Sequence, residues 1–251
     1  MNNQNEEGES ELFSKFLTNN LQYLNNNSRI NHFFSEDNLS INYLSILMHG
    51  YPYVPFSGSS LSPFCLNHII NDIVINNRTK IIKFGSGVSS IFIGGLIKKN
   101  NLKTTLLSVE HDLEWSKQLS IMLLKENLDD VVKICYAPLK KCALALDENE
   151  WYNPAIIDLA VDNTLFDMVI IDGPPAWMKD KSSAQYPAVP YIMGKLNKNY
   201  SIYLDDANRQ GEQEIVVAWE QKHTIKFNYS GSSLAHYYAG NSFYTEPYAY
   251  Y

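Results

Sequence analysis

Positive charge is scarce in this sequence of 251 residues. Lysine and arginine together number 20, against 27 aspartate and glutamate residues, which gives a formal net charge of −7. No segment gathers the basic residues into a block. Because phosphate binding requires concentrated positive charge, the composition disfavours a nucleic acid, or any other acidic macromolecule, as the partner.

Long apolar runs and a cysteine framework are also lacking. No apolar run approaches the ~18 residues of a membrane span, and the N-terminal segment MNNQNEEGES is too polar and acidic for a signal peptide. The three cysteines, Cys65, Cys135 and Cys142, have no metal-ligand spacing and an odd count. These absences predict a reduced, cytoplasmic protein with no membrane partner, and they leave a homo-oligomer open.

Four short segments carry the pattern that indicates the fold. Each is an apolar run rich in Ile, Val and Leu that ends in a turn or an acidic group, and they span 80–90, 106–112, 166–175 and 201–209. Such runs are typical of strands buried on both faces of a parallel sheet. Ligands of these sheets bind at the carboxyl ends of the strands. We therefore expect one crevice to contain the groups that end the runs: Gly85, Gly87, Glu110, Asp172, Asp205 and Asp206.

The rest of the sequence alternates between strand and helix patterns. Strands are expected at 81–84, 104–110, 131–136, 168–172 and 202–205, helices at 63–75, 88–99, 113–127 and 209–221, and a closing antiparallel pair at 222–229 and 234–241. The organisation predicts a disordered tail at 1–10, an N-terminal helical cap at 11–78 and an α/β domain at 79–251. The fold class is a doubly wound, mostly parallel sheet of seven strands with helices on both faces.

A Gly-Ser-Gly turn, formed by Gly85, Ser86 and Gly87, follows the first strand and opens a helix. Glycines there let a ligand approach the backbone, and the free N–H groups at the helix start favour an anion. The third glycine of the dinucleotide fingerprint is missing, since Ser90 stands in its place. Glu110 ends the next strand, 25 residues after Gly85, where a carboxylate can accept hydrogen bonds from both ribose hydroxyls. Together these features predict a nucleoside ligand, with a solvated strand-end acid or a helix N-cap as the alternative role of Glu110.

Carboxylates also end the fourth and fifth strands. Asp172 ends the fourth, and Asp205 and Asp206 end the fifth, which is its neighbour in a doubly wound sheet. Carboxylates this close repel one another unless a cation or a proton intervenes. Oxygen ligands suit Mg²⁺, so one hypothesis is a magnesium site. The alternative is that Asp206 caps a helix while Asp172 binds the ligand.

Two histidines and one tryptophan are further candidates. His111 directly follows Glu110 and therefore lies near the expected nucleoside site. His236 is a second possible acid or base, although lone histidines are more often structural or exposed. Trp115, one helical turn beyond His111, either joins the core or flanks an adenine, and we favour the core.

At these residues the sequence resembles the class I S-adenosylmethionine-dependent methyltransferases, most of all the small O-methyltransferases of bacterial sugar, glycan and natural-product clusters. The resemblance covers roughly residues 56–219 and implies a Rossmann-like methyltransferase sheet with an N-terminal helical cap. It implies S-adenosylmethionine as cofactor, with the methionine part at the Gly-Ser-Gly turn, the ribose at Glu110 and the adenine near the segment after the third strand. The implied cofactor-binding residues are Gly85, Ser86, Gly87, Glu110, His111, Ala137, Pro138, Leu139 and Asp172.

The implied reaction is methyl transfer to a hydroxyl of a small-molecule acceptor, with a sugar or glycan precursor as one candidate. In metal-dependent members of the family, residues at the positions of Asp172, Asp205 and Asp206 bind Mg²⁺, which would lower the pKa of the acceptor hydroxyl. Without a metal, one of these carboxylates or a nearby histidine would be the general base. The implied catalytic residues are Asp172 and His111.

Three features depart from the family's pattern. Lys83 stands where an acid usually holds the ammonium group of the cofactor, so like charges are expected to meet. Pro174 and Pro175 stand where many relatives carry a general base, and Gln185 replaces a common arginine. Two other functions therefore stay open, a nicotinamide-dependent oxidoreductase and a catalytically silent, cofactor-binding subunit.

Overall fold

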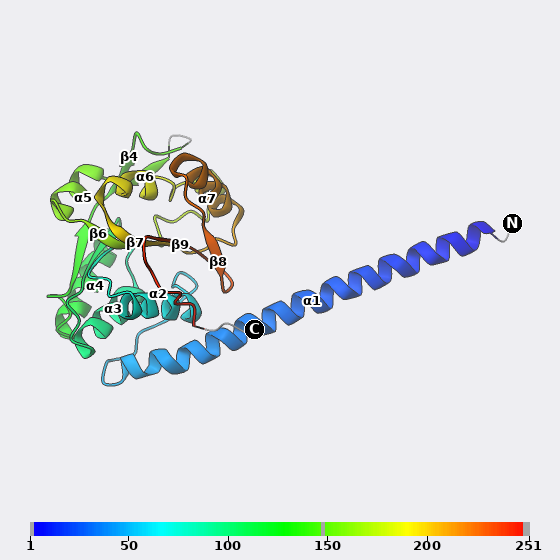
Figure 1. Ribbon diagram of the computed structural model, residues 1–251, viewed down its shortest axis with the longest axis horizontal. Coiled ribbons are helices and arrows are strands. Elements are labelled where there is room, and N and C mark those ends of the chain that lie inside the picture. The colour runs from blue at the N-terminus through cyan, green and yellow to red at the C-terminus, as the bar shows by residue number, and fades with distance from the viewer. Residues whose placement is uncertain (1–2, 147–148, 248–251) are drawn as a thin grey trace.

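A computed structural model describes residues 3–146 and 149–247 of the chain, and seven of its strands form one sheet in the order β3-β2-β1-β6-β7-β9-β8 (Figure 1). The strands of this sheet are β1 (Lys80–Phe84), β2 (Thr105–Glu110), β3 (Val132–Tyr136), β6 (Phe166–Ile171), β7 (Leu196–Leu204), β8 (Asn228–Ser230) and β9 (Leu234–Ala239). The first five run parallel, whereas β9 lies antiparallel to both β7 and β8. The expected doubly wound, mostly parallel sheet is confirmed.

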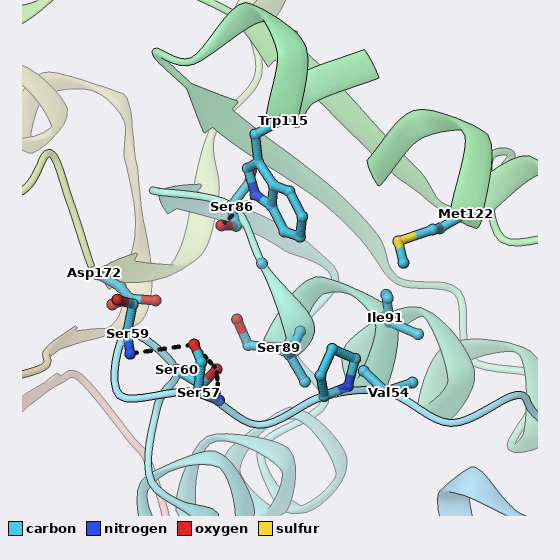
Figure 2. Close-up of a pocket in the computed structure, with 13 residues that line it drawn as sticks. Val54, Ser57, Ser59, Ser60, Ser86, Ser89, Ile91, Trp115, Met122 and Asp172 are labelled. Atoms are coloured by element: carbon cyan, nitrogen blue, oxygen red, sulfur yellow. Dashed lines mark hydrogen bonds between the residues drawn. The ribbon is translucent and has the colours of Figure 1, made fainter. Parts of the chain in front are cut away.

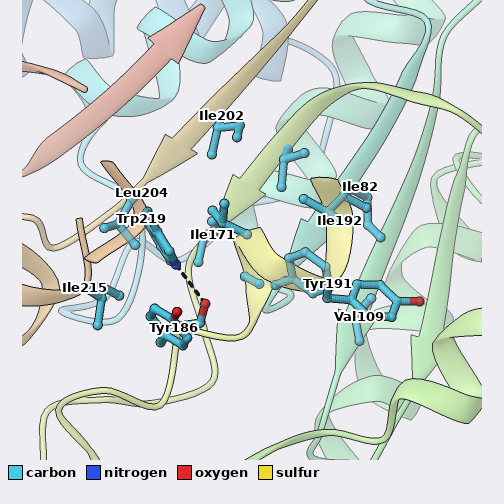
Figure 3. Close-up of a cluster of buried hydrophobic side chains, with 14 of the residues drawn as sticks. Ile82, Val109, Ile171, Tyr186, Tyr191, Ile192, Ile202, Leu204, Ile215 and Trp219 are labelled. Carbon is cyan, nitrogen blue, oxygen red and sulfur yellow. Dashed lines mark hydrogen bonds between the residues drawn. The ribbon is translucent and has the colours of Figure 1, made fainter. Parts of the chain in front are cut away.

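Helices cover both faces of the sheet. One face carries α2 (Pro63–Ile75), α3 (Val88–Lys99) and α4 (Leu113–Lys125), and the other carries α5 (Pro154–Val161), α6 (Ala188–Ile192) and α7 (Gln210–His223). Two 3-10 helices, η1 (Lys179–Lys181) and η2 (Met193–Lys195), flank α6. Successive strand residues point to opposite faces. Ile82 joins the core below α5, α6 and α7 (Figure 3), as does Phe84, whereas Ile81 joins the core below α2, α3 and α4.

The N-terminal segment differs from the predicted tail and cap. A single helix, α1, runs from Asn3 to Met48, and Figure 1 shows its first part extending away from the sheet. The structure thus describes residues 3–10 as helix where a disordered tail is expected from composition, and residues 1–2 lie outside the described residues. Near the other end of α1, Leu44 is buried in the core below α2 and α3. None of the described helices is both long and apolar enough to span a membrane.

Helix α2 begins as the sequence predicts. Ser62 is its N-cap and accepts a hydrogen bond from the Cys65 N–H (3.3 Å), while Pro63 occupies the first turn, where its missing N–H costs nothing. Most of α2 is buried against the sheet. This part of the predicted cap is therefore one of the layers of the α/β core.

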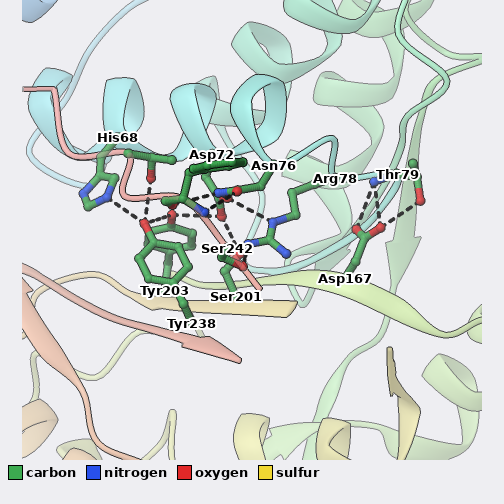
Figure 4. A network of polar contacts seen from close by, with 12 residues as sticks. His68, Asp72, Asn76, Arg78, Thr79, Asp167, Ser201, Tyr203, Tyr238 and Ser242 are labelled. Atoms are coloured by element: carbon green, nitrogen blue, oxygen red, sulfur yellow. Dashed lines mark hydrogen bonds and ion pairs between the residues drawn. The ribbon is translucent and has the colours of Figure 1, made fainter. Parts of the chain in front are cut away.

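A buried polar network holds α2 on the sheet (Figure 4). Asp72 of α2 is fully buried and pairs with Arg78 Nε at 3.0 Å. It also accepts hydrogen bonds from Ser201 Oγ (2.5 Å) and Tyr203 OH (3.0 Å), both on β7. The Tyr203 hydroxyl lies 2.8 Å from that of Tyr238 on β9. Because a buried carboxylate is stable only when it is paired and hydrogen-bonded, these contacts fix α2 against β7 and β9.

His236 belongs to this interior and not to the crevice. It is buried, its ring centroid lies 4.9 Å from that of His68, and burial lowers its pKa to about 4. Its structural role agrees with the expectation for a lone histidine.

Several boundaries differ from the sequence predictions. Helix α7 continues to His223 and ends at Thr224, which takes a left-handed φ of 55°, so β8 starts at Asn228 and not at residue 222. Strand β7 begins at Leu196, six residues before the predicted start. The apolar pattern does not reveal this part of the strand, because Asn197, Lys198 and Asn199 are polar and exposed. Two further strands, β4 (Leu139–Lys141) and β5 (Glu150–Tyr152), form an antiparallel pair in a stretch for which no strand is expected from the sequence.

Candidate functional site

The crevice forms where β1, β2 and β6 end. The Gly85 N–H donates to Val109 O on β2, and the Asp172 N–H donates to Phe84 O on β1, each at 2.9 Å. Gly85 has a φ of +95°, and a Cβ at this position would overlap the backbone carbonyl of Asp172. The close approach of the strand ends therefore requires glycine at position 85.

Glu110 is joined to the Gly-Ser-Gly turn. Its Oε2 accepts hydrogen bonds from Ser86 Oγ (2.5 Å) and Ser86 N–H (3.3 Å), and its Oε1 accepts from the N–H groups of His111 and Asp112, each at 2.7 Å. The residue is only 3% exposed. Burial alone would raise the pKa of Glu110, but the hydrogen bonds from His111, Asp112 and Ser86 outweigh it and lower the pKa below its ordinary value. The structure thus brings Glu110 to the turn, as the sequence predicts.

Lys83 lies directly below the turn and is 0% exposed. Its Nζ lies 2.5 Å from Asp172 Oδ2 and donates to Gly85 O at 3.0 Å. The ammonium group is therefore compensated by Asp172. The expectation that Lys83 meets the ammonium group of the cofactor as an unpaired charge is not supported. A lysine inside a buried strand requires such a partner. Asp172 provides it, because it directly follows the adjacent strand β6.

The other two crevice carboxylates are also compensated. Asp206 is paired with Arg209, and its side chain remains 45% exposed. Asp205 is buried and accepts a hydrogen bond from Ser233 Oγ at 3.0 Å. Burial first, and then the charges of Asp172 and Asp206, raise the pKa of Asp205 to about 8.

These contacts do not support the predicted magnesium site at Asp172, Asp205 and Asp206. Mg²⁺ binds carboxylates that are free to coordinate it, but here Asp172 is paired with Lys83, Asp206 is paired with Arg209, and Asp205 is buried against Ser233. Within 3–146 and 149–247, no group of three or more His, Cys, Asp or Glu side chains could hold a metal ion. The sequence correctly indicates that clustered carboxylates need compensation, but the compensating groups belong to the chain itself.

A cavity of about 300 Å³ opens between the Gly-Ser-Gly turn, the start of α3 and the loop before α2 (Figure 2). Gly87 and Asp172 line it, and a Cβ on Gly87 would meet no atom within 4 Å. Trp115 also lines it and donates from Nε1 to Ser86 O at 3.2 Å. The expectation that Trp115 joins the core is therefore wrong, because its ring is half-buried beside the cavity.

One wall of this cavity comes from a loop that the sequence reasoning leaves without a role. Ser57, Ser59 and Ser60 line the cavity opposite the start of α3. The Ser57 N–H donates to Ser60 Oγ (3.1 Å) and the Ser59 N–H donates to Ser57 Oγ (3.3 Å), so the hydroxyls fix the loop. The Pro-, Gly- and Ser-rich composition of 51–63 is the signal that marks this loop, but it does not show which way the loop folds.

Tyr152 on β5 also lies at the site, and the sequence pattern does not predict its position there. It is fully buried, and its hydroxyl has no hydrogen-bond partner among the residues that the structure describes. A Cβ on Gly173 would lie 2.6 Å from this hydroxyl, so Gly173 leaves room for it beneath the crevice.

The remaining predicted residues follow the ends of β2 and β3. The Ala137 N–H donates to Glu110 O at 2.7 Å, and His111 Nδ1 lies 3.0 Å from Glu110 Oε1. Pro138 O accepts a hydrogen bond from the N–H of Asn153, the N-cap of α5. Leu139 lines a different cavity, of about 240 Å³. The structure therefore gathers Ala137 and His111 around Glu110 and places Leu139 away from the cavity of Figure 2.

No family model and no curated protein matches this sequence. Solved structures share its fold. An O-methyltransferase from Bacillus cereus in complex with S-adenosylhomocysteine aligns over 82% of this chain and 91% of its own, with 13% identity and a TM-score of 0.51. An S-adenosylhomocysteine-bound methyltransferase from Podospora anserina aligns over 80% and 88%, with 12% identity and a TM-score of 0.56. At such identities the likeness shows the fold, which is that of these methyltransferases.

Proposed function

We propose that this chain transfers a methyl group from S-adenosylmethionine to a hydroxyl of a small molecule. The observation that carries the proposal is the hydrogen-bonded junction of the turn at 85–87 with Glu110 through Ser86, at the ends of adjacent parallel strands. Ligands with a nucleoside bind at such strand ends, with an acid on the ribose. The two solved structures that share the fold and hold S-adenosylhomocysteine support the same ligand class.

The described residues fit this cofactor. Gly87 leaves open space beside the first N–H groups of α3, where no side chain caps the helix, so an anionic group of the ligand can lie against them. Glu110 can accept hydrogen bonds from ribose hydroxyls in exchange for the one it now accepts from Ser86 Oγ. When bound, S-adenosylmethionine supplies an electrophilic methyl group.

The chain's remaining task is to hold the acceptor oxygen in line and to take its proton. We assign the proton to Asp172, because this carboxylate lines the cavity while Lys83 supports its charge from below. His111 is the less suitable base, because its ring lies against Glu110. We propose an uncharged acceptor such as a sugar or glycan precursor.

One observation favours a second candidate function, a cofactor-binding subunit without catalysis. Asp172 is already ion-paired with Lys83 at 2.5 Å, and such pairing weakens a carboxylate as a base. A nicotinamide-dependent oxidoreductase is less compatible with this sheet. In the dinucleotide-binding fold the strands at this edge are parallel, whereas here β9 lies antiparallel to β7.

Turnover separates these functions. Mass spectrometry would follow S-adenosylhomocysteine released from S-adenosylmethionine in the presence of hydroxylated acceptors, using the wild type, Asp172→Asn and the exposed control Asp180→Asn. We expect product from the wild type and the control, and at least a hundredfold less from Asp172→Asn, within the range lost with a general base. Cofactor binding without product on any acceptor would favour the silent subunit, and equal rates for Asp172→Asn would remove Asp172 from the mechanism.

A further inference from the structure

A second polar cavity, of about 310 Å³, lies beside the carboxyl end of β7. It is an open cavity, bounded by the loop after β7, the first turns of α7, the turn between β8 and β9, and one ring from α1. The described residues that line it carry amide, hydroxyl or aromatic groups, or small and apolar side chains, and none is charged. The side chains that matter for the argument are Phe33, Asn208, Gln213, Tyr229, Ser232 and Ser233.

One wall of this cavity is hydrogen-bonded to a crevice carboxylate. Ser233, in its wall, donates from Oγ to Asp205 Oδ1 at 3.0 Å, and the Ala207 N–H donates to Ser233 O at 2.7 Å. Asp205 follows β7, which pairs in parallel with β6, and the neighbouring strand end carries Asp172. The cavity therefore lies at the same edge of the sheet as the proposed methyl-transfer site.

The turn that forms the cavity has a fixed shape. Gly231, at its tip, takes a φ of +58°, and a Cβ there would lie 2.5 Å from the Phe64 ring of α2. Since no other residue fits this conformation and contact, the turn is held against α2. The wall is thus preformed, as is usual for small-molecule sites.

The lining selects the class of ligand. Amides and hydroxyls offer both donors and acceptors to a molecule with several hydroxyl groups, and the rings of Phe33 and Tyr229 offer apolar faces. A charged ligand would find no counter-charge among the described residues that line the cavity. The volume lies at the lower end of small-molecule sites, which span roughly 300–1,000 Å³. It therefore suits one ring and not an extended chain.

We propose that this cavity binds a neutral, polyhydroxylated ring, one sugar unit, as part of the methyl acceptor. The proposal rests on the proposed function, because the methyl group would go to a hydroxyl of the molecule seated there. It makes the β8–β9 turn and the start of α7 the part of the chain that selects the acceptor.

Saturation-transfer NMR with defined glycosides tests the proposal. The probes are methyl glucoside, methyl galactoside and methyl mannoside, each compared with its uronic acid or 6-phosphate counterpart. Asn208→Leu and Gln213→Leu fill the cavity from two exposed positions, so neither substitution should unfold the chain. Gln221→Leu is the control, because it is an exposed glutamine of α7 that does not line the cavity.

We expect at least one neutral glycoside to bind the wild type and Gln221→Leu, and to bind Asn208→Leu and Gln213→Leu at least fivefold more weakly. The proposal is overturned if no neutral glycoside binds, if both cavity variants bind it as well as the control, or if the charged counterparts bind equally well. S-adenosylhomocysteine is titrated into the same samples by calorimetry. Cofactor binding without glycoside binding would overturn this inference alone, whereas a lack of cofactor binding would overturn the proposed function itself.

Discussion

Replacing Lys83 by methionine should leave the carboxylate of Asp172 without its cation. Methionine keeps the length and the apolar stem of the side chain, so the main loss is the ammonium group, which lies 2.5 Å from Asp172 Oδ2 and 3.0 Å from Gly85 O. Removing one partner of a buried ion pair typically costs about 3–5 kcal/mol. Because the Asp172 side chain keeps 16% exposure, we expect Lys83→Met to lower the free energy of unfolding by about 3 kcal/mol, the lower end of that range.

Urea unfolding of a double-mutant cycle measures this effect. The cycle consists of the wild type, Lys83→Met, Asp172→Asn and the double variant, which leaves neither charge unpaired. We expect the double variant to be more stable than the sum of the two single losses by at least about 1 kcal/mol, as is typical of residues in direct contact. Lys80→Met is the matched control, because Lys80 begins the same strand but is exposed, and surface changes stay within about 0.5 kcal/mol.

Additive losses in the cycle would refute this reasoning. So would a Lys83→Met variant that is no less stable than Lys80→Met. Either result would mean that the Lys83–Asp172 pair does not hold the two strand ends together.

Three further predictions concern the crevice. Gly85→Ala should lower the free energy of unfolding by at least about 2 kcal/mol through backbone strain, whereas Gly87→Ala, at an extended φ of 172° with open space around it, should keep its stability in urea but bind S-adenosylhomocysteine more weakly by calorimetry. Unchanged affinity of Gly87→Ala would show that no ligand approaches this backbone. Glu110→Gln should flatten the acid limb of the curve of stability against pH. The lowered pKa of Glu110 stabilises the folded wild type at pH values above 4.5, the ordinary pKa of the group, and this contribution is lost as the pH falls through the folded-state pKa. Acid titration of unfolding checks this, and identical acid limbs would contradict it. The stability of Asp205→Asn relative to the wild type should increase as the pH rises from 6 to 9. The reason is that the raised pKa of Asp205 makes the wild type lose stability as the pH rises from about 4 to about 8, and asparagine does not titrate. Melting temperatures at the two pH values test this, and a constant difference between the two proteins would argue against it.

The order of buried strands was predictable because apolar runs and turn residues encode it locally. The run before Gly85 and the run before Glu110 became β1 and β2 within one residue of their predicted bounds. The start of β7 was not predictable, because polar residues, 197–199, follow Leu196, and their strand conformation depends on the pairing of Phe166 with Leu196. The length of α7 likewise depends on the left-handed end at Thr224, a residue type that carries no such signal.

The position of single residues at the strand ends could be predicted from the sequence. The pairing of side chains from different strands could not. Gly85 and Glu110 could be placed at one crevice because parallel strands end at the same edge of a sheet. The pairing of Lys83 with Asp172 depends on how two side chains from different strands meet, which the sequence does not record. The same limit explains the unsupported magnesium site, because the carboxylates are visible in the sequence whereas their internal counter-charges are not.

Calorimetric titration of S-adenosylhomocysteine into the wild type, Glu110→Gln and Glu114→Gln tests the central claim most directly. Glu114 is an exposed glutamate in the first turn of α4, four residues after Glu110, and serves as the matched control. We expect the wild type and Glu114→Gln to bind S-adenosylhomocysteine but not NAD⁺. Glu110→Gln should bind it about tenfold more weakly or worse, because it loses charge-assisted hydrogen bonds worth about 1.5–3 kcal/mol. Binding of NAD⁺ in its place, or equal affinity of all three proteins for S-adenosylhomocysteine, would contradict the account.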